Sequence, residues 1–566
     1  MAVAEALLYL FMSCSNDSIA AVVFGVVLHT HYRRSEPKVL VFLLHSLVPG
    51  VCATVKHLFM FDSEGATTVT IPGAIAYAAR FLAEYYYVSM SASVLAYRIS
   101  PFHPLAAFPG PKSAAASKWW SFYRLAVRGQ RHIDLQRHAS DYALYTSSLT
   151  RIQSAQTLRD RSGPNELSID DPSAISAIYE GLERAAFYQA IPANGISLIN
   201  ILDRQMHQKR RRAWNSAFTP SCLEGYANSV NQRLLQLLER MADEIRQSPT
   251  GGIQIDRWTE DITGDIGFLG GFETIKEETH KDGWDWFSTG EVPWVKNFME
   301  MVGRHGPLGE FLQGTSVNAN FLIFAANKVQ PTAAKLRRVR ELQEATTRTS
   351  IMSKVLSKSD ENSLELRTVD VIVDAMLTII AAAGSTSFVI QSLLYDLSLS
   401  PLRMRRIQEE VDPLFEKAIL MKLPYLSACV DKVLRLTPPL AWGPPRTTGP
   451  QGAMICGRFV PPNTNISVPI YAMQRDVRNF GPLAEKFIPE RWLPSDQAYI
   501  PFSAGYGRCP GRALGLQNAK IAVATILHNY SLAPEEGFDP AAYEASFRDN
   551  GVWTRDALKL RFSPRQ

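Results

Sequence analysis

Cysteine is scarce in this chain of 566 residues, and no two cysteines are spaced as metal ligands or redox partners would be. The six cysteines are scattered, at positions 14, 52, 222, 429, 456 and 509. This pattern argues against a disulfide framework and is typical of free thiols in a reducing compartment.

A large excess of charge of one sign is also missing. The chain has 59 Lys and Arg against 54 Asp and Glu, and the net charge of +5 does not suggest a nucleic-acid partner. Hydrophobic residues make up 46% of the chain, which supplies ample core for a protein larger than one small domain.

The amino terminus lacks the basic start of a cleaved signal peptide, and it contains Glu5. We expect residues 1–98 to anchor the chain in a membrane, because apolar stretches there are long enough to cross a hydrocarbon core of ~30 Å. Up to three transmembrane helices are expected, near residues 7–28, 39–60 and 71–97.

The charges of two loops predict how this anchor is oriented. Residues 31–38 are basic and residues 62–64 are acidic, so the positive-inside rule places the remaining chain in the cytosol. A proline-rich hinge at 99–112 ends the last span, and residues 113–566 follow as the body. We expect the membrane to be that of the endoplasmic reticulum.

A glycine-rich loop surrounds Cys509 in the sequence FSAGYGRCPGR, residues 502–512, and an apolar run typical of a helix follows at 513–527. Gly505 and Gly507 allow the backbone to turn tightly around the sulfur. The amides that begin the following helix point towards the cysteine and favour its thiolate. A thiolate held in this way is the axial ligand that haem iron needs for oxygen activation, although a lone cysteine is more often a buried structural residue.

The spacing of Phe502, Gly505, Cys509 and Gly511 resembles the haem-binding loop of the cytochrome P450 family. The resemblance covers roughly residues 100–566 and implies a mainly α fold with small β-sheets around one haem, with Cys509 as the iron ligand. It implies insertion of one atom of O₂ into a hydrophobic small molecule, with electrons from NADPH delivered by NADPH–cytochrome P450 reductase. The motifs look fungal, and fungal members often act on terpenoids or other secondary metabolites.

The resemblance also implies which residues contact the haem propionates. His207 and Arg211 are one turn apart on a basic helix, where the family binds propionates, although a solvated face or a docking surface is the simpler alternative. Arg446 stands where the family places another propionate-binding arginine. The Arg or His that the family usually has two residues before the cysteine is Gly507 here, and we expect Arg508 to act as its substitute.

A long apolar segment at 371–399 predicts a helix buried in the middle of the domain. Its centre carries Ser385, Thr386 and Ser387, and the resemblance implies that one of these hydroxyls relays protons to bound oxygen. The acid that the family places before its threonine is absent. Alignment on the preceding glycine puts Ser387 at the threonine position, whereas counting back from the end of the helix puts Ser385 there.

A second departure from the family lies at Lys432, where the family has a glutamate that joins two arginines, here Arg435 and Arg491. Asp431 and Glu490 are the two carboxylates that could balance the positive charge of these three basic residues. Asp431 is adjacent to Lys432, but on a helix its side chain points about 100° away. Because an unpaired buried charge costs several kcal/mol, we expect this element to be weakened.

Two other functions remain open. The missing acid favours a haem enzyme that does not activate O₂, such as an isomerase, a dehydratase or a peroxygenase. Lys432 favours a degenerate, non-catalytic haem-binding membrane protein. The aromatic-rich segment 268–312 corresponds to the substrate-entry region of the family.

Overall fold

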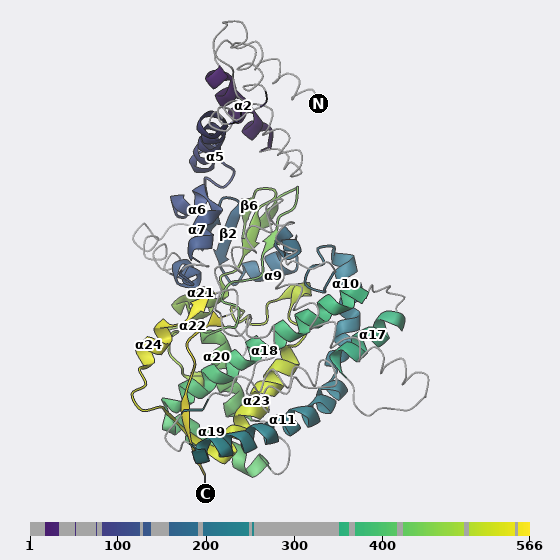
Figure 1. The fold of residues 1–566 in the computed structure, drawn as a ribbon, viewed down its shortest axis with the longest axis vertical. Helices are drawn as coiled ribbons and strands as arrows, with labels where there is room; N and C mark the ends of the chain where they lie inside the picture. Colours follow the sequence, from purple (N-terminus) through teal and green to yellow (C-terminus); the bar gives the residue numbers. More distant parts are fainter. Residues whose placement is uncertain are drawn as a thin grey trace.

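The computed structural model describes residues 17–32, 51, 75, 82–124, 128–136, 158–190, 196–247, 252–253, 350–361, 368–415, 423–491, 497–549 and 553–565. The described chain is mainly helical with small β-sheets, as the sequence predicts. Figure 1 shows α2 and α5 at one end of the molecule, the region of β2, β6 and α9 beside them, and the long helices packed at the other end.

The helices and short helical turns (η) are distributed along the whole described chain. In chain order they are α2 (Asp17–Tyr32), η1 (Leu82–Tyr87), α5 (Val88–Ile99), α6 (Lys112–Ala116), α7 (Lys118–Phe122), α9 (Ala174–Tyr179), η3 (Ala186–Ala190), α10 (Arg204–Asn215), η4 (Ser216–Phe218), α11 (Pro220–Gln247), α17 (Ile351–Glu361), α18 (Thr368–Ser398), α19 (Pro401–Phe415), α20 (Pro424–Leu436), α21 (Ile470–Arg475), α22 (Val477–Phe480), η5 (Pro489–Arg491), η6 (Gly505–Gly507), α23 (Arg512–Asn529) and α24 (Pro540–Ala545). The strands are β1 (Leu158–Gly163), β2 (Glu166–Asp170), β3 (Glu183–Arg184), β4 (Arg446–Thr447), β5 (Ala453–Ile455), β6 (Arg458–Val460), β7 (Asn465–Ser467), β8 (Tyr530–Pro534), β9 (Arg548–Asp549), β10 (Trp553–Thr554) and β11 (Leu560–Pro564).

One sheet brings together strands that are far apart in the sequence, in the order β1-β2-β7-β4-β3. Only β2 and β7 pair in parallel; the other neighbours are antiparallel. In the pair β3–β4, Arg184 lies directly opposite Arg446, which places two arginines side by side at one edge of the sheet.

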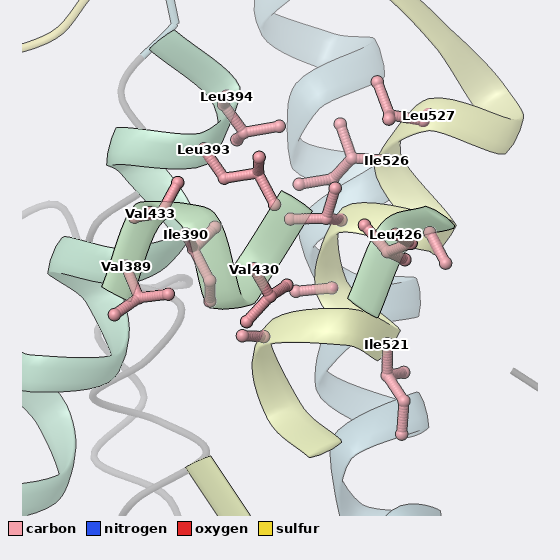
Figure 2. Packing of buried hydrophobic residues seen from close by; sticks show 14 of the residues in the cluster. Val389, Ile390, Leu393, Leu394, Leu426, Val430, Val433, Ile521, Ile526 and Leu527 are labelled. Carbon is pink, nitrogen blue, oxygen red and sulfur yellow. The ribbon is translucent and has the colours of Figure 1, made fainter. Parts of the chain in front are cut away.

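The main core forms where α18, α20 and α23 pack together. Figure 2 shows their apolar side chains pointing towards one another, among them Leu393 of α18, Val430 of α20 and Ile526 of α23. All three of these residues are fully buried. The predicted central helix at 371–399 is thus α18, and the helix predicted after the cysteine loop is α23.

The expected transmembrane helices find no support in the described residues. Helix α2 has 16 residues and α5 has 12, whereas a span needs about 20. Across the parts of the chain with a described conformation, no helix is both long enough and apolar enough to cross a bilayer. Much of the predicted spans, near 7–28, 39–60 and 71–97, lies outside the described residues.

Candidate haem-binding site

The loop before α23 folds tightly around Cys509, as its glycines predict. The Cys509 amide donates to the carbonyl of Phe502 at 2.9 Å, which closes the loop. Gly505 has a φ of +65°, and a Cβ at this position would lie 2.2 Å from the carbonyl oxygen of Tyr179. Only glycine meets both conditions, so the loop can rest directly on the end of α9.

The thiol of Cys509 differs from the other cysteine side chains that the structure describes. Cys222 and Cys429 are buried, whereas Cys509 is exposed. Protein atoms nevertheless surround the sulfur densely, and this desolvation raises its pKa, against the lowering effects of the Gly511 amide and the Arg211 guanidinium. The predicted stabilisation of a thiolate is therefore present but smaller than the cost of desolvation. A bound metal cation would supply the charge that a thiolate needs here.

Helix α10 is fixed against the cysteine loop on one side and against α18 on the other. Arg211 donates from Nη1 to the carbonyl of Arg508 at 2.7 Å and from Nε to Asn215 at 2.8 Å. Arg210, buried, donates to Asp374 of α18 at 2.6 Å. Arg211 therefore lies beside the loop.

Arg508, in the loop itself, is exposed, and its role as a substitute propionate ligand stays a prediction.

His207 lies one turn before Arg211 and is fully buried. Its Nε2 is 3.0 Å from Nη2 of Arg184. Because a guanidinium can only donate, Nε2 accepts and Nδ1 carries the proton. Burial, followed by the charges of Arg184, Arg211 and Arg446, lowers the pKa of His207 to about 3, so the imidazole is neutral. No hydrogen-bond acceptor for the buried Nδ1 lies within the described residues.

Arg184 and Arg446 form a basic cluster with the aromatic rings next to the cysteine loop. The guanidinium of Arg446, a residue 1% exposed, lies 5.3 Å from the ring centre of Tyr506 and 5.2 Å from that of Tyr179. The guanidinium of Arg184 lies 5.1 Å from the ring centre of Tyr188. Within the described part of the chain, no carboxylate forms an ion pair with either arginine.

This cluster is suited to a ligand with carboxylate groups. Two arginines held side by side repel each other, and an anion between them would remove that cost. Haem carries two propionates, so these residues fit the cofactor that the sequence implies. Arg184 was not found from the sequence, because its only local signal is an arginine in a strand of two residues.

The three hydroxyls in the centre of α18 have different surroundings. Ser385 donates to the carbonyl of Ala381 at 2.6 Å. Ala381 and Gly384 on the same face are exposed, and a Cβ on Gly384 would meet no atom within 4 Å. The hydroxyl of Ser387 instead accepts a hydrogen bond from Gln391 at 2.8 Å, and Thr386 lies between the two serines, half-buried. All three residues are half-buried, so exposure does not distinguish them, and which hydroxyl relays protons stays a prediction.

Lys432 occupies the place that the family gives to a glutamate, and it is buried. Burial and the charges of Arg435 and Arg491 lower its pKa to about 8, while Glu490 acts in the opposite direction. Three basic side chains therefore converge on α20 and η5, as the sequence predicts.

The two carboxylates expected to compensate have other partners. Glu490 accepts hydrogen bonds from Arg406 at 3.0 Å and from the hydroxyl of Tyr425 at 2.9 Å. Asp431 accepts from the hydroxyl of Tyr499 at 2.8 Å. Lys432 therefore gains little from either of them.

The part of the chain with described side chains holds no group of three or more His, Cys, Asp or Glu residues that could bind a metal ion. The predicted substrate-entry segment 268–312 lies outside the described residues.

Among the described residues, Cys509 is the exposed cysteine, and the closed glycine loop around it lies beside a basic cluster without an ion-paired carboxylate, which is an arrangement that fits a haem-thiolate site. The family model of cytochrome P450 matches residues 177–548, which is more than half of the chain. The chain therefore belongs to the cytochrome P450 family, whose cofactor is cysteine-ligated haem.

Curated relatives extend over most of the chain and are named as monooxygenases. Cytochrome P450 monooxygenase phqL of Penicillium fellutanum is 29% identical over 493 residues, covering 84% of this chain and 82% of the relative. Cytochrome P450 monooxygenase AMT3 of Alternaria alternata is 29% identical over 492 residues, covering 81% and 94%. Tryprostatin B 6-hydroxylase of Aspergillus fumigatus is 28% identical over 485 residues, covering 80% and 79%. This chain is accordingly a cytochrome P450 monooxygenase.

Proposed function

We propose that this monooxygenase binds haem through Cys509 and hydroxylates or otherwise oxidises a hydrophobic small molecule of secondary metabolism, for example a terpenoid. One observation carries the proposal: Cys509 is the accessible cysteine of the described chain, and it stands in a closed loop beside a basic cluster that lacks a carboxylate. The relative named tryprostatin B 6-hydroxylase supports hydroxylation as the type of reaction.

The bound haem supplies O₂ activation, and the chain supplies binding, orientation and protons. Arg446 and Arg211 bind the propionates, and Arg508 at the exposed end of the loop adds a further donor. His207 accepts a hydrogen bond from Arg184 and holds that guanidinium in place beside the cluster. Ser385, next to the exposed Gly384 at the centre of α18, passes protons towards the oxygen-binding side.

The electrons come from NADPH through NADPH–cytochrome P450 reductase. We further propose that residues before the hinge anchor the chain in the endoplasmic reticulum membrane, with the body in the cytosol. The basic loop at 31–38 and the acidic segment at 62–64 support this orientation. Protease treatment of sealed microsomes tests it.

The replacement Cys509→Ala tests the function directly, with Cys456→Ala, a half-buried cysteine outside the loop, as the matched control. The wild type and the control should show the Soret band of a carbon-monoxide complex of thiolate-ligated ferrous haem. Cys509→Ala should lose this band, together with NADPH-dependent product formation from extracts of the source organism. A band that survives in Cys509→Ala would refute the assignment of the ligand.

A further inference from the structure

We propose that Asp374 of α18 is a positioning residue, and that its ion pair with Arg210 of α10 fixes the distance between α18 and the Cys509 loop. The inference rests on the proposed function, which places the iron ligand in this loop and the proton relay at the centre of α18. The loop and α18 are then two walls of the cofactor site. An ion pair that joins them sets the width of the site and the place of the relay within it.

Two neighbouring arginines of α10 reach in different directions, one to each wall. Arg211 donates to the carbonyl of Arg508 in the Cys509 loop at 2.7 Å. Arg210 donates to Oδ2 of Asp374 from Nη2 at 2.6 Å and from Nε at 3.0 Å. Consecutive residues of a helix point about 100° apart, so one turn of α10 holds both contacts at once. Helix α10 therefore acts as a spacer between the loop and α18.

The ion pair is shielded from water and is supported by its surroundings. Asp374 and Arg210 are both buried. Nη2 of Arg210 also donates to the backbone carbonyl of Asp370 at 3.1 Å, and the indole nitrogen of Trp214, one turn further along α10, donates to Oδ2 of Asp374 at 3.4 Å. Because solvent cannot replace these contacts, a movement of α18 away from α10 would leave buried charges unpaired. The pair therefore strongly favours one separation of the two helices.

The other carboxylate oxygen of Asp374 joins a third segment to the same point. Oδ1 accepts a hydrogen bond from the amide of Leu198 at 2.9 Å. The carbonyl of Leu198 in turn accepts from Nη1 of Arg184, a member of the basic cluster, at 3.0 Å. Asp374 thus lies where three parts of the site meet, namely α18, α10 and the segment that leads to the basic cluster.

A contribution to stability alone is the simpler explanation of this ion pair. A buried ion pair, however, stabilises a fold little more than well-packed apolar side chains would, because both charges lose their hydration. What the pair adds is geometry, since a guanidinium and a carboxylate bind best at one distance and in one plane. The two roles predict different results. Loss of stability alone leaves the surroundings of the cofactor unchanged, whereas loss of position changes them.

The test compares Asp374→Asn with Asp134→Asn in the haem-loaded protein. Asp374→Asn keeps the shape of the side chain and the acceptor for Leu198, but it turns an amide nitrogen towards Arg210. Asp134 is also buried and paired with an arginine, but its partner Arg124 belongs to the same short segment, so this pair joins no two walls. The infrared C–O band of the ferrous carbon-monoxide complex reports on the surroundings of the cofactor, and thermal unfolding reports on stability.

We expect both variants to lower the melting temperature, because each leaves an arginine without its carboxylate. Only Asp374→Asn should also shift and broaden the C–O band and lower the yield of product per NADPH consumed, by roughly fivefold or more, since small displacements of a reacting group are costly. A wild-type band and yield in Asp374→Asn would overturn the proposal. So would an equal change of the band in both variants, which indicates a general loosening of the fold. Failure of the wild type itself to bind haem would instead refute the proposed function.

A double variant covers the case in which Asp374→Asn does not fold. In Arg210→Gln/Asp374→Asn no buried charge is left unpaired. Because glutamine is shorter than arginine, the two amides can hydrogen-bond only if α10 and α18 approach each other, so the C–O band should again differ from that of the wild type. A double variant that folds with the wild-type band and yield would show that the ion pair fixes nothing that the reaction needs, and the proposal would fail.

Discussion

Replacement of Lys432 by glutamate is expected to stabilise the protein. In the structure this buried amine faces Arg435 and Arg491, and its pKa falls from 10.5 to about 8. At 1.36 kcal/mol per pKa unit, the full shift corresponds to ~3 kcal/mol against folding at neutral pH. Glu490 and Arg491 beside it are exposed, so solvent screening reduces this to ~1–2 kcal/mol.

The pH dependence of this cost has a definite sign. The unfolded lysine keeps its proton up to its ordinary pKa of 10.5, whereas the folded one releases it near 8. Below pH 8 the destabilisation is complete; between pH 8 and 10.5 the unfolded state binds more protons, so stability recovers as the pH rises. The difference in the free energy of unfolding between the wild type and an uncharged variant such as Lys432→Met should therefore decrease as the pH rises from 8 to 10.5.

The assay is thermal unfolding of the haem-loaded protein at pH 7 and at pH 9.5. Lys432→Glu should raise the melting temperature at pH 7 by ~1–3 °C, given the unfolding entropy of a chain of this size. Lys486→Glu, which makes the same charge change at an exposed position, should have almost no effect. If Lys432→Glu leaves the melting temperature unchanged or lowers it, and Lys432→Met also leaves it unchanged, then the three cations do not repel one another as the structure indicates.

Two further predictions concern catalysis and the membrane. Ser385→Ala should lower the yield of product per NADPH consumed by roughly tenfold, because the centre of α18 loses the hydroxyl proposed to relay protons. Ser387→Ala should change this ratio little, since its hydroxyl is engaged by Gln391, and the reverse order would place the proton relay at Ser387. Protease added to sealed microsomes should digest the body at 113–566; full protection would contradict a cytosolic orientation.

Features that depend on neighbouring residues could be predicted from the sequence. The spacing of Phe502, Gly505 and Cys509 predicts a closed loop, and the hydrogen bond from Cys509 to Phe502 closes it. The apolar run at 371–399 predicts the helix α18, whose second half from Phe388 to Leu397 is largely buried, whereas Ala381 and Gly384 at its centre are exposed. Asp431 points away from Lys432, as helix geometry requires, and binds Tyr499 instead.

Features that depend on the relative size of opposing electrostatic effects, or on residues far apart in the sequence, could not be predicted. Helix amides and Arg211 do favour a thiolate at Cys509, but their effect is smaller than desolvation, and a sequence carries no measure of that difference. The register at the centre of α18 stays open, because two alignments place different serines at one position and both serines are half-buried in the structure.

The missing residue at Gly507 shows why local motifs are an incomplete guide to this site. A sequence motif specifies the residue type at one position, whereas binding of a cofactor depends on which chemical group lies next to it in the fold. In this chain the space beside Gly507 receives guanidinium groups from β3 and β4, strands that are hundreds of residues away from each other and pair only in the fold. The sequence points to Arg508, the nearest arginine along the chain, as the substitute, and this stays a prediction; the guanidinium nearest the space is that of Arg446, followed by that of Arg184. A departure from a family motif is therefore evidence of lost function only after the volume around it has been searched for a replacement.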